Sequence, residues 1–179
     1  NIVSYNAGSI RMQGAFYAAM GDAKISMIDV RDVGSAAAKI LLDPQTHSGN
    51  TYEVNGPEAV SNSDIADRIS RVAGRKISYV DIPEEAQRKA TLDLGMQGWL
   101  VTAVLQLQEY YRTGKCVTVD GTVAKLTGQP ERRLHQYLLA NAASFQTHAA
   151  CACGAELNSP HHASGGTSAR ERTLQPDET

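Results

Sequence analysis

The chain has 179 residues, of which 42% are hydrophobic and 20% are charged, and its formal net charge is −2. This length fits one domain with a real core, and the near-neutral charge offers no basic field for nucleic acid, so no nucleic-acid contact is predicted. No apolar run approaches the ~20 residues that a membrane-spanning helix needs, so no membrane segment is predicted.

The three cysteines are an odd number without the spacing of a disulfide framework. They favour a reducing compartment, and the cytoplasm is the predicted location. The sequence does not begin with Met, and its first ten residues lack the basic start and apolar centre of a secretory signal. We therefore expect the true N-terminus to lie upstream.

The first 43 residues predict a strand followed by a helix. Asn1 to Ile10 is expected to be the end of a helix or an irregular segment, and Met12 to Asp22 is expected to be a loop. In Lys24 to Leu42 a short apolar run predicts a strand, and apolar residues that then recur at helical spacing predict a helix, with a polar turn between them. Asp32 is the predicted N-cap of that helix, and Asp43, which precedes a proline, is predicted to end it.

The middle of the chain continues the alternation of strands and helices. Thr51 to Val54 alternates as a strand does, and Ser61 to Gly74 predicts the clearest helix. Ser61 with Asp64 resembles a capping box, and Gly74 suits the left-handed position after the helix. Ile77 to Ile82 is the next predicted strand.

The remainder of the folded part is predicted to be mostly helical. Pro83 to Leu94 reads as a helix with proline at its first position, and Val123 to Leu126 reads as one helical turn. Trp99 to Tyr111 and Glu131 to Phe145 are predicted amphipathic helices. The predicted apolar face of the first of these consists of Leu100, Ala103, Val104, Leu107, Tyr110 and Tyr111.

From Gln146 to Thr179 the composition changes, and Leu157 and Leu174 are the only large aliphatic residues. Such a segment buries too little apolar surface to offset its ordering entropy, so a disordered tail is predicted. The tail holds Cys151, Cys153, His161 and His162. Their spacing is unlike that of a structural zinc site, and no metal is predicted.

Few residues of the folded part suggest chemistry of their own. His135 lies beside two arginines on a predicted helix, which favours a solvated histidine over a general base, and Cys116 suits a small buried hydrophobe. Asp29, Arg31 and Asp32 fit either a charged cluster at a ligand crevice or an N-cap with an ion pair to Arg31. The two interpretations are compatible.

The order of three stretches resembles the C-terminal half of the NmrA-like, atypical short-chain dehydrogenase/reductase proteins. The stretches are DVRDVGSAAAKILLDP, GNTYEVNGPEAVSNSDIADRISRVAGRKISYVDIPEE and KLTGQP. The resemblance covers residues 1–145 and excludes the tail, residues 146–179. It implies an α/β fold, namely the C-terminal part of a Rossmann-like doubly wound sheet with a small, mostly helical substrate subdomain.

The resemblance also implies NADP or NAD as the cofactor. The family's glycine-rich turn, G-x-x-G-x-x-G, is absent from this sequence, so the chain by itself is expected to bind dinucleotide poorly. By resemblance Asn1 lies near the nicotinamide, Phe16 and Tyr17 belong to a loop at the substrate pocket, and Trp99 belongs to a variable substrate lid. No catalytic residue is assigned.

The implied function is the substrate-pocket half of an NAD(P)H-dependent reductase for a small quinone, azo or carbonyl compound. The alternatives are a redox-sensing protein that binds the cofactor and regulates a partner without turnover, and an inactive remnant. In each case the strands of this half would expose an unpaired edge, so the chain is expected to be a piece of a longer protein or to be completed by a partner.

Overall fold

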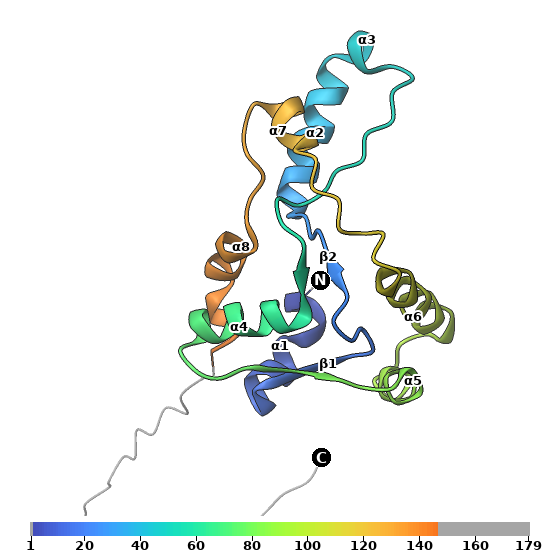
Figure 1. Ribbon diagram of the computed structural model, residues 1–179, viewed down its shortest axis with the longest axis vertical. Coiled ribbons are helices and arrows are strands. Elements are labelled where there is room, and N and C mark those ends of the chain that lie inside the picture. Colours follow the sequence, from blue (N-terminus) through green and yellow to red (C-terminus); the bar gives the residue numbers. More distant parts are fainter. Residues whose placement is uncertain (1, 147–179) are drawn as a thin grey trace, which may run out of the picture. The chain divides into compact units, whose positions relative to one another are not determined.

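The computed structural model describes residues 2–146, which fold into short strands and a larger number of helices (Figure 1). In chain order the elements are α1 (Ile2–Gln13), β1 (Ala15–Ala18), β2 (Lys24–Ile25), α2 (Val30–Leu42), α3 (Pro44–His47), β3 (Val60–Ser61), α4 (Asn62–Ala73), β4 (Ser78–Asp81), α5 (Glu84–Asp93), α6 (Gly98–Arg112), α7 (Thr122–Thr127), α8 (Leu134–Ala140) and a 3-10 turn, η1 (Ala142–Ser144). Within these residues, none of the helices combines the length and apolar character that a bilayer crossing requires.

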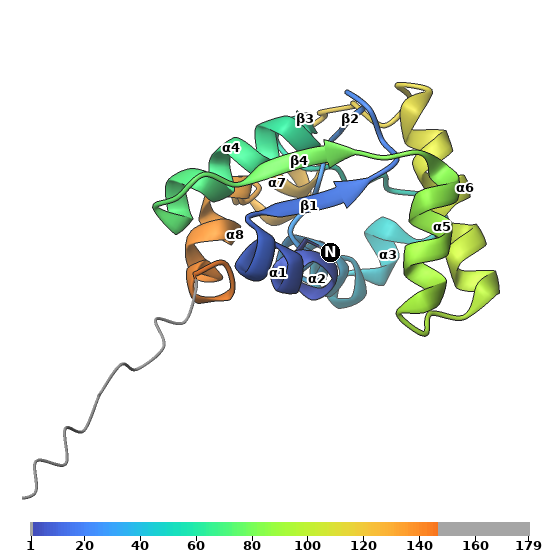
Figure 2. The ribbon, with the colours of Figure 1, turned by 90° about the horizontal axis from the view of Figure 1, so that it is seen from below.

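The strands form two small ladders. β1 and β4 pair in parallel, with Ala15 opposite Ser78 and Ala18 opposite Asp81. β2 and β3 pair antiparallel through only two residues of each strand. Figure 2 shows β1 and β4 side by side, with α5 and α6 beyond their carboxyl ends. A parallel pair needs a long crossover, which the segment containing α2, α3 and α4 supplies, and the predicted α/β class is confirmed.

One apolar cluster holds these elements together. Phe16 on β1 packs against the partly buried Tyr79 on β4 with ring centroids 5.5 Å apart. α4 contributes Ile65 and Ile69, whose spacing in the sequence is that of one helical face, and Val72 packs at the margin. The fully enclosed members of the cluster are Ile10, Phe16, Val60, Ile65, Ala66, Ile69, Ile77, Leu138 and Phe145.

α4 has the ends that its sequence predicts. The Asp64 N–H donates to Ser61 Oγ at 3.1 Å, and the Ser61 N–H donates to Asp64 Oδ2 at 2.9 Å, which completes the capping box. Gly74 ends the helix with φ +66°. The predicted helix at Pro83 is also present, but proline occupies the N-cap and not the first helical position.

One prediction near the N-terminus is wrong and another is partly confirmed. Residues 2–13 form a regular helix, which is one of the two alternatives expected for Asn1 to Ile10, whereas the predicted loop Met12–Asp22 contains strand β1. Gly14, at φ +67°, lets the chain turn from α1 into this strand, where β4 supplies the backbone partners. Phe16 and Tyr17 are residue types that favour strands, but the small residues around them give no strand pattern, and the pairing with a segment about 60 residues later completes the structure.

The cap of α2 and the face of α6 also differ from the prediction. Asp29 is the N-cap of α2, and Asp32 lies within the first turn. On α6 the buried residues are Val101 and Leu105, whereas Tyr110 of the predicted apolar face is 50% exposed. The side of α6 that meets α5 and β2 decides which residues are covered, and spacing alone does not reveal that side.

Two more segments are less regular than predicted. Thr51 to Val54 is extended but pairs with no strand of the described residues. The predicted helix from Glu131 to Phe145 is reduced to α8 and η1, while α7 contains the predicted turn at residues 123–126. All of the predicted tail except Gln146 lies outside the described residues, so its disorder stays a prediction, as does its lack of a metal site.

Candidate functional site

The last residue of β1 and the three residues after it, residues 18–21, form a loop that is fixed at the carboxyl ends of the two parallel strands. Asp81 Oδ1 accepts hydrogen bonds from the backbone N–H groups of Met20 at 3.1 Å and Gly21 at 2.7 Å. The Tyr79 hydroxyl lies 2.8 Å from the same oxygen and 2.9 Å from the Ala18 carbonyl oxygen. One carboxylate and one phenol of β4 therefore hold the loop that leaves β1.

The ionisation of this pair suits a structural role. The Gly21 N–H and then the Tyr79 hydroxyl lower the pKa of Asp81 below its ordinary value. Burial, followed by the hydrogen bond to Asp81, raises the pKa of Tyr79. At neutral pH Asp81 is thus a carboxylate and Tyr79 is a neutral phenol, and both are occupied by the loop.

Helices α5 and α6 hold the same loop from the other side. The Ala19 N–H donates to Gln87 Oε1 of α5 at 2.6 Å, and Arg112 Nη1 of α6 donates to the Ala19 carbonyl oxygen at 2.5 Å. Arg112 also lies 3.8 Å from the carboxylate of Glu84. The carboxyl end of the parallel pair is consequently enclosed by a fixed loop and two helices.

The structure places the predicted pocket residues in different surroundings. Phe16 is in the core, at 3% exposure. Tyr17, the next residue on β1, is 40% exposed, and its hydroxyl donates to Gln13 Oε1 at 2.9 Å. Trp99 is 69% exposed near the start of α6. Asn1 lies outside the described residues, so the pocket and cofactor roles stay predictions.

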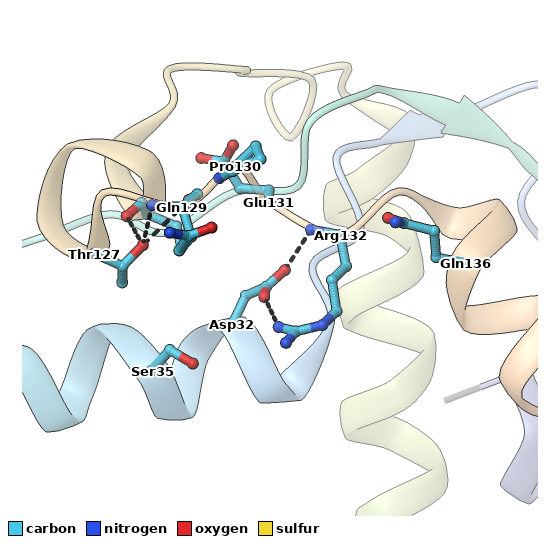
Figure 3. A pocket seen from close by; sticks show the side chains of 9 residues that line it. Asp32, Ser35, Thr127, Gln129, Pro130, Glu131, Arg132 and Gln136 are labelled. Atoms are coloured by element: carbon cyan, nitrogen blue, oxygen red, sulfur yellow. Dashed lines mark hydrogen bonds and ion pairs between the residues drawn. The ribbon is translucent and has the colours of Figure 1, made fainter.

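A second polar site lies where α2 meets the segment before α8. The backbone N–H of Arg132 donates to Asp32 Oδ2 at 2.7 Å, and its guanidinium binds Asp32 Oδ1 (Figure 3). The Asp32 side chain is 4% exposed and that of Arg132 is 41% exposed. A carboxylate this buried needs a charged partner, and Arg132 supplies one from 100 residues away.

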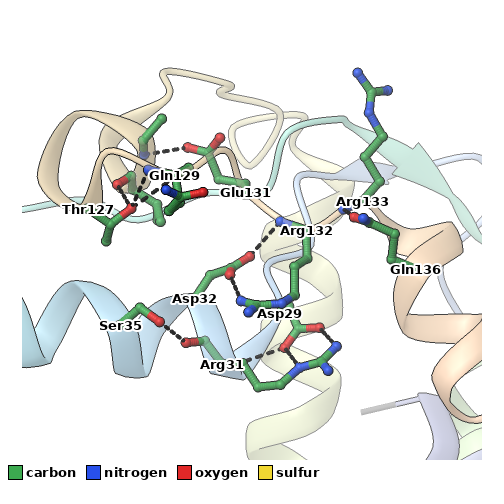
Figure 4. Close-up of polar contacts among 12 residues, drawn as sticks. Asp29, Arg31, Asp32, Ser35, Thr127, Gln129, Glu131, Arg132, Arg133 and Gln136 are labelled. Atoms are coloured by element: carbon green, nitrogen blue, oxygen red, sulfur yellow. Dashed lines mark hydrogen bonds and ion pairs between the residues drawn. The ribbon is translucent and has the colours of Figure 1, made fainter.

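The neighbouring acid, Asp29, makes a separate ion pair. Asp29 Oδ1 accepts from the backbone N–H and from Nε of Arg31, both at 2.9 Å, and Oδ2 accepts from Nη2 at 2.6 Å (Figure 4). These bonds to Arg31 lower the pKa of Asp29. The predicted cap with an ion pair to Arg31 is present, with Asp29 in the place expected for Asp32.

Two cavities flank Arg132. One, of about 270 Å³, is lined by Asp32, Ser35, Val123, Thr127, Gln129, Pro130, Glu131, Arg132 and Gln136. The other, of about 260 Å³, is lined by Met27, Ile28, Asp29, Val30, Arg132, Arg133, Leu134 and Tyr137. Phe16, Tyr17 and Trp99 line neither of these two cavities.

The sequence analysis did not single out Arg132. Two signals could have indicated it: the two adjacent arginines before α8, and the acid in α2, which needs a cation as its partner when it is buried.

A model of the NmrA-like family matches residues 7–136. The chain belongs to the NmrA-like family. It is 36% identical over 145 residues to the NAD(P)H azoreductase of Xenophilus azovorans, which covers 81% of this chain and 50% of the azoreductase. It is 34% identical over 145 residues to the (4-alkanoyl-5-oxo-2,5-dihydrofuran-3-yl)methyl phosphate reductase of Streptomyces griseus, again 81% of this chain and 50% of the relative.

Solved structures share the NmrA-like fold. The NADPH-dependent quinone oxidoreductase of Escherichia coli superposes with a TM-score of 0.69 at 24% identity, over 75% of this chain and 49% of that chain. The triphenylmethane reductase of Citrobacter superposes with a TM-score of 0.67 at 17% identity, over 79% and 49%. These matches confirm the Rossmann-like α/β fold and the resemblance seen in the sequence. The chain spans about half the length of the relatives it matches.

At α2 and α4 the residues of this NmrA-like chain do not fit the phosphates of a dinucleotide. Such phosphates need the N–H groups of an open helix N-terminus after a glycine-rich turn. At α2 the carboxylate of Asp29 occupies that place and Asp32 lies one turn away, and at α4 Ser61 and Asp64 close the helix. Phosphate would meet carboxylates at both helices.

The described residues also offer little for metal or nucleophilic chemistry. No group of three or more His, Cys, Asp or Glu side chains among residues 2–146 is arranged to hold a metal ion. His135 is exposed, as expected of a solvated histidine, and Cys116 is a free thiol that is only half-buried. The His and Cys residues of the tail lie outside the described part.

Proposed function

We propose that this chain is the substrate-pocket half of an NAD(P)H-dependent reductase that acts by hydride transfer on a small quinone, azo or carbonyl compound. The observation that supports it best is the loop fixed beyond the carboxyl ends of β1 and β4. In open α/β sheets, ligands bind in that position. Membership of a family whose matched relatives include an azoreductase and a quinone oxidoreductase supports the substrate class.

In this proposal the chain binds the substrate and does not hold the cofactor. Gln87 and Arg112 keep the loop at residues 18–21 in one conformation, so that the pocket wall is formed before the substrate arrives. Trp99 and Tyr17 provide exposed aromatic faces that suit flat, conjugated substrates. NADP or NAD would be held by a glycine-rich Rossmann portion, with the cytoplasm as the proposed location.

No group at this edge is assigned as an acid or base. Asp81 and Tyr79 contact the loop, and at neutral pH they are a carboxylate and a neutral phenol. Both also make hydrogen bonds to the loop backbone. Their proposed contribution is to position the loop.

The test uses a fusion, in which the portion of the X. azovorans azoreductase that this chain does not match precedes Asn1. Oxidation of NADPH and of NADH is followed by absorbance with a panel of quinones, azo dyes and aldehydes. Turnover by the fusion, with none by the chain alone, is the expected result. Tight cofactor binding without turnover on the whole panel would contradict the reductase proposal and favour a redox sensor.

A further inference from the structure

The peptide group between Ala19 and Met20 is held by opposite charges on its two sides. Its carbonyl oxygen accepts from Arg112 Nη1 of α6 at 2.5 Å, and its N–H donates to Asp81 Oδ1 of β4 at 3.1 Å. Ala19 and Met20 are 4% and 6% exposed, so water competes little for these bonds. Hydrogen bonds to ionised groups are roughly twice as strong as neutral ones. Arg112 and Asp81 together therefore fix the orientation of this peptide.

Arg112 lies at the end of the covered face of α6. Val101 and Leu105 are the buried residues of this helix, and Gln108 and Arg112 follow them at helical spacing on the same side. Among the described residues of α6, Arg112 is the only one with a hydrogen bond to residues 18–21. The polar attachment of α6 to this loop thus depends on one guanidinium.

The same guanidinium also ties the loop to α5. Arg112 Nη2 lies 3.8 Å from Glu84 Oε2, and Glu84 Oε1 lies 3.4 Å from Arg88 Nη2. Arg88 Nη1 in turn donates to Thr102 Oγ1 of α6 at 3.3 Å. α5 and α6 are therefore joined to each other by polar contacts, and Figure 2 shows the two helices beyond the carboxyl ends of β1 and β4.

We propose that Arg112 is a positioning residue for the substrate. It sets the orientation of the Ala19–Met20 peptide and the placement of α6 against the loop, and so determines the shape of the site beyond β1 and β4. Arg112 acts through the loop and touches no reacting atom. The effect on substrate rests on the proposed function, whereas the effect on the loop does not.

The geometry calls for arginine and not only for a positive charge. A planar guanidinium with five donors can meet a carbonyl oxygen and a carboxylate at once, whereas the ammonium of lysine is a point charge on a flexible stem. A cation in the last turn of a helix also stabilises its dipole, and lysine would serve that purpose equally well. Arg112→Lys therefore separates the positioning role from a general helix-end role.

Amide hydrogen exchange of the chain alone, resolved by residue, tests the effect on the loop. In Arg112→Met the Met20 and Gly21 amides, which both donate to Asp81, should exchange about tenfold faster, because a charge-assisted bond to the loop is lost. The amide of Ile69 in α4 should keep its wild-type rate. Arg112→Lys should give a smaller increase at the loop. Lys115→Met, which removes an exposed cation three residues later, is the matched control and should match the wild type.

The azoreductase fusion tests the effect on substrate. Arg112→Met should raise KM for a quinone about tenfold and lower kcat less than about threefold, because the wall of the site is no longer formed in advance. In Arg112→Ala, millimolar guanidinium should restore part of the affinity, since the Arg112 side chain is 38% exposed and its place can be reached from solvent. Guanidinium should not rescue Arg112→Met, whose side chain fills that place. A purely structural arginine would show neither the KM change nor the rescue.

The outcomes separate this inference from the proposed function. Wild-type exchange at Met20 and Gly21 in Arg112→Met would overturn the inference. If that variant unfolds, so that Ile69 also exchanges fast, Arg112→Lys decides: faster loop exchange with an unchanged Ile69 supports the inference, and wild-type loop exchange overturns it. No turnover by the unmodified fusion would contradict the proposed function and leave the fixing of the loop intact. Turnover with an unchanged KM in Arg112→Met would keep the proposed function and remove Arg112 as a positioning residue for the substrate.

Discussion

Helices α4 and α2 are almost the same length, yet they differ in how completely the chain covers them. α4 has a closed capping box, a left-handed glycine at its end, and three buried residues in the core. α2 has a good cap and a buried ion pair, but Val30, Leu41 and Leu42 are exposed. The comparison shows that α4 is covered within the described chain, whereas α2 contacts α7, α3 and the Arg132 segment and still leaves these apolar side chains exposed.

The largest expected effect compares one residue from each helix. Ile69→Ala on α4 should lower the free energy of unfolding by about 2–5 kcal/mol, because its fully buried side chain leaves a cavity. Leu41→Ala on α2 should change it by less than about 0.5 kcal/mol, because that side chain is already in water. Urea denaturation of both variants measures the difference, and similar losses would show that α2 is covered.

The next effect concerns the attachment of α2 to the segment before α8. Asp32→Asn should lower the free energy of unfolding by about 1–3 kcal/mol, since a buried charged hydrogen bond to Arg132 is lost while the half-exposed guanidinium can still reach water. Lys89→Gln, which breaks the exposed pair with Asp93, is the control and should cost at most about 0.5 kcal/mol. Equal small losses in urea would mean that the Asp32 pair does not anchor α2.

The N-cap of α2 should make this side of the molecule sensitive to acid. The hydrogen bonds from Arg31 lower the folded-state pKa of Asp29, so the unfolded chain takes up a proton first as the pH falls. The stabilisation is therefore present above the unfolded pKa of about 4 and is lost as the pH falls through the lower folded value.

Asp29→Asn, which keeps a capping side chain, should show a smaller fall in urea midpoint between pH 6 and pH 3 than the wild type. Glu109→Gln, at an exposed carboxylate on α6, should keep the wild-type fall. An unchanged pH profile in Asp29→Asn would contradict the assignment of acid sensitivity to this cap.

The sequence predicts α4, whose signals are local, better than the parts of the fold that depend on distant residues. The signals for α4 lie within the helix itself and at its ends, so Ser61 and Asp64 were sufficient to predict its start and Gly74 its end. β1 was missed because its partner β4 lies about 60 residues away, and the Asp32–Arg132 pair was missed because it spans 100 residues. Conversely, Thr51 to Val54 has the pattern of a strand, but the described residues supply no partner for it.

The candidate site also depends on contacts between residues that are far apart in the sequence. The family resemblance predicted Phe16, Tyr17 and Trp99 as pocket residues, but it could not show that Phe16 is turned into the core by its position on β1. Alternation along a strand makes neighbouring residues face opposite sides, so Phe16 and Tyr17 cannot share one surface. The residues that fix the loop at 18–21 come from β4, α5 and α6, and only the folded chain brings them together.

The smallest expected effect on stability belongs to Trp99, which is 69% exposed. Trp99→Ala should leave the free energy of unfolding within about 0.5 kcal/mol, because few contacts are lost.

If the exposed indole stacks on a flat substrate, the same variant in the azoreductase fusion should raise KM for a quinone by about threefold to tenfold, with kcat little changed. A change of that size corresponds to the loss of one aromatic contact. Leu94→Ala, at a similarly exposed site just before α6, should leave KM unchanged. A change in KM without a change in stability would separate binding from folding at this end of the molecule, and equal KM values in the two variants would remove Trp99 from the substrate pocket.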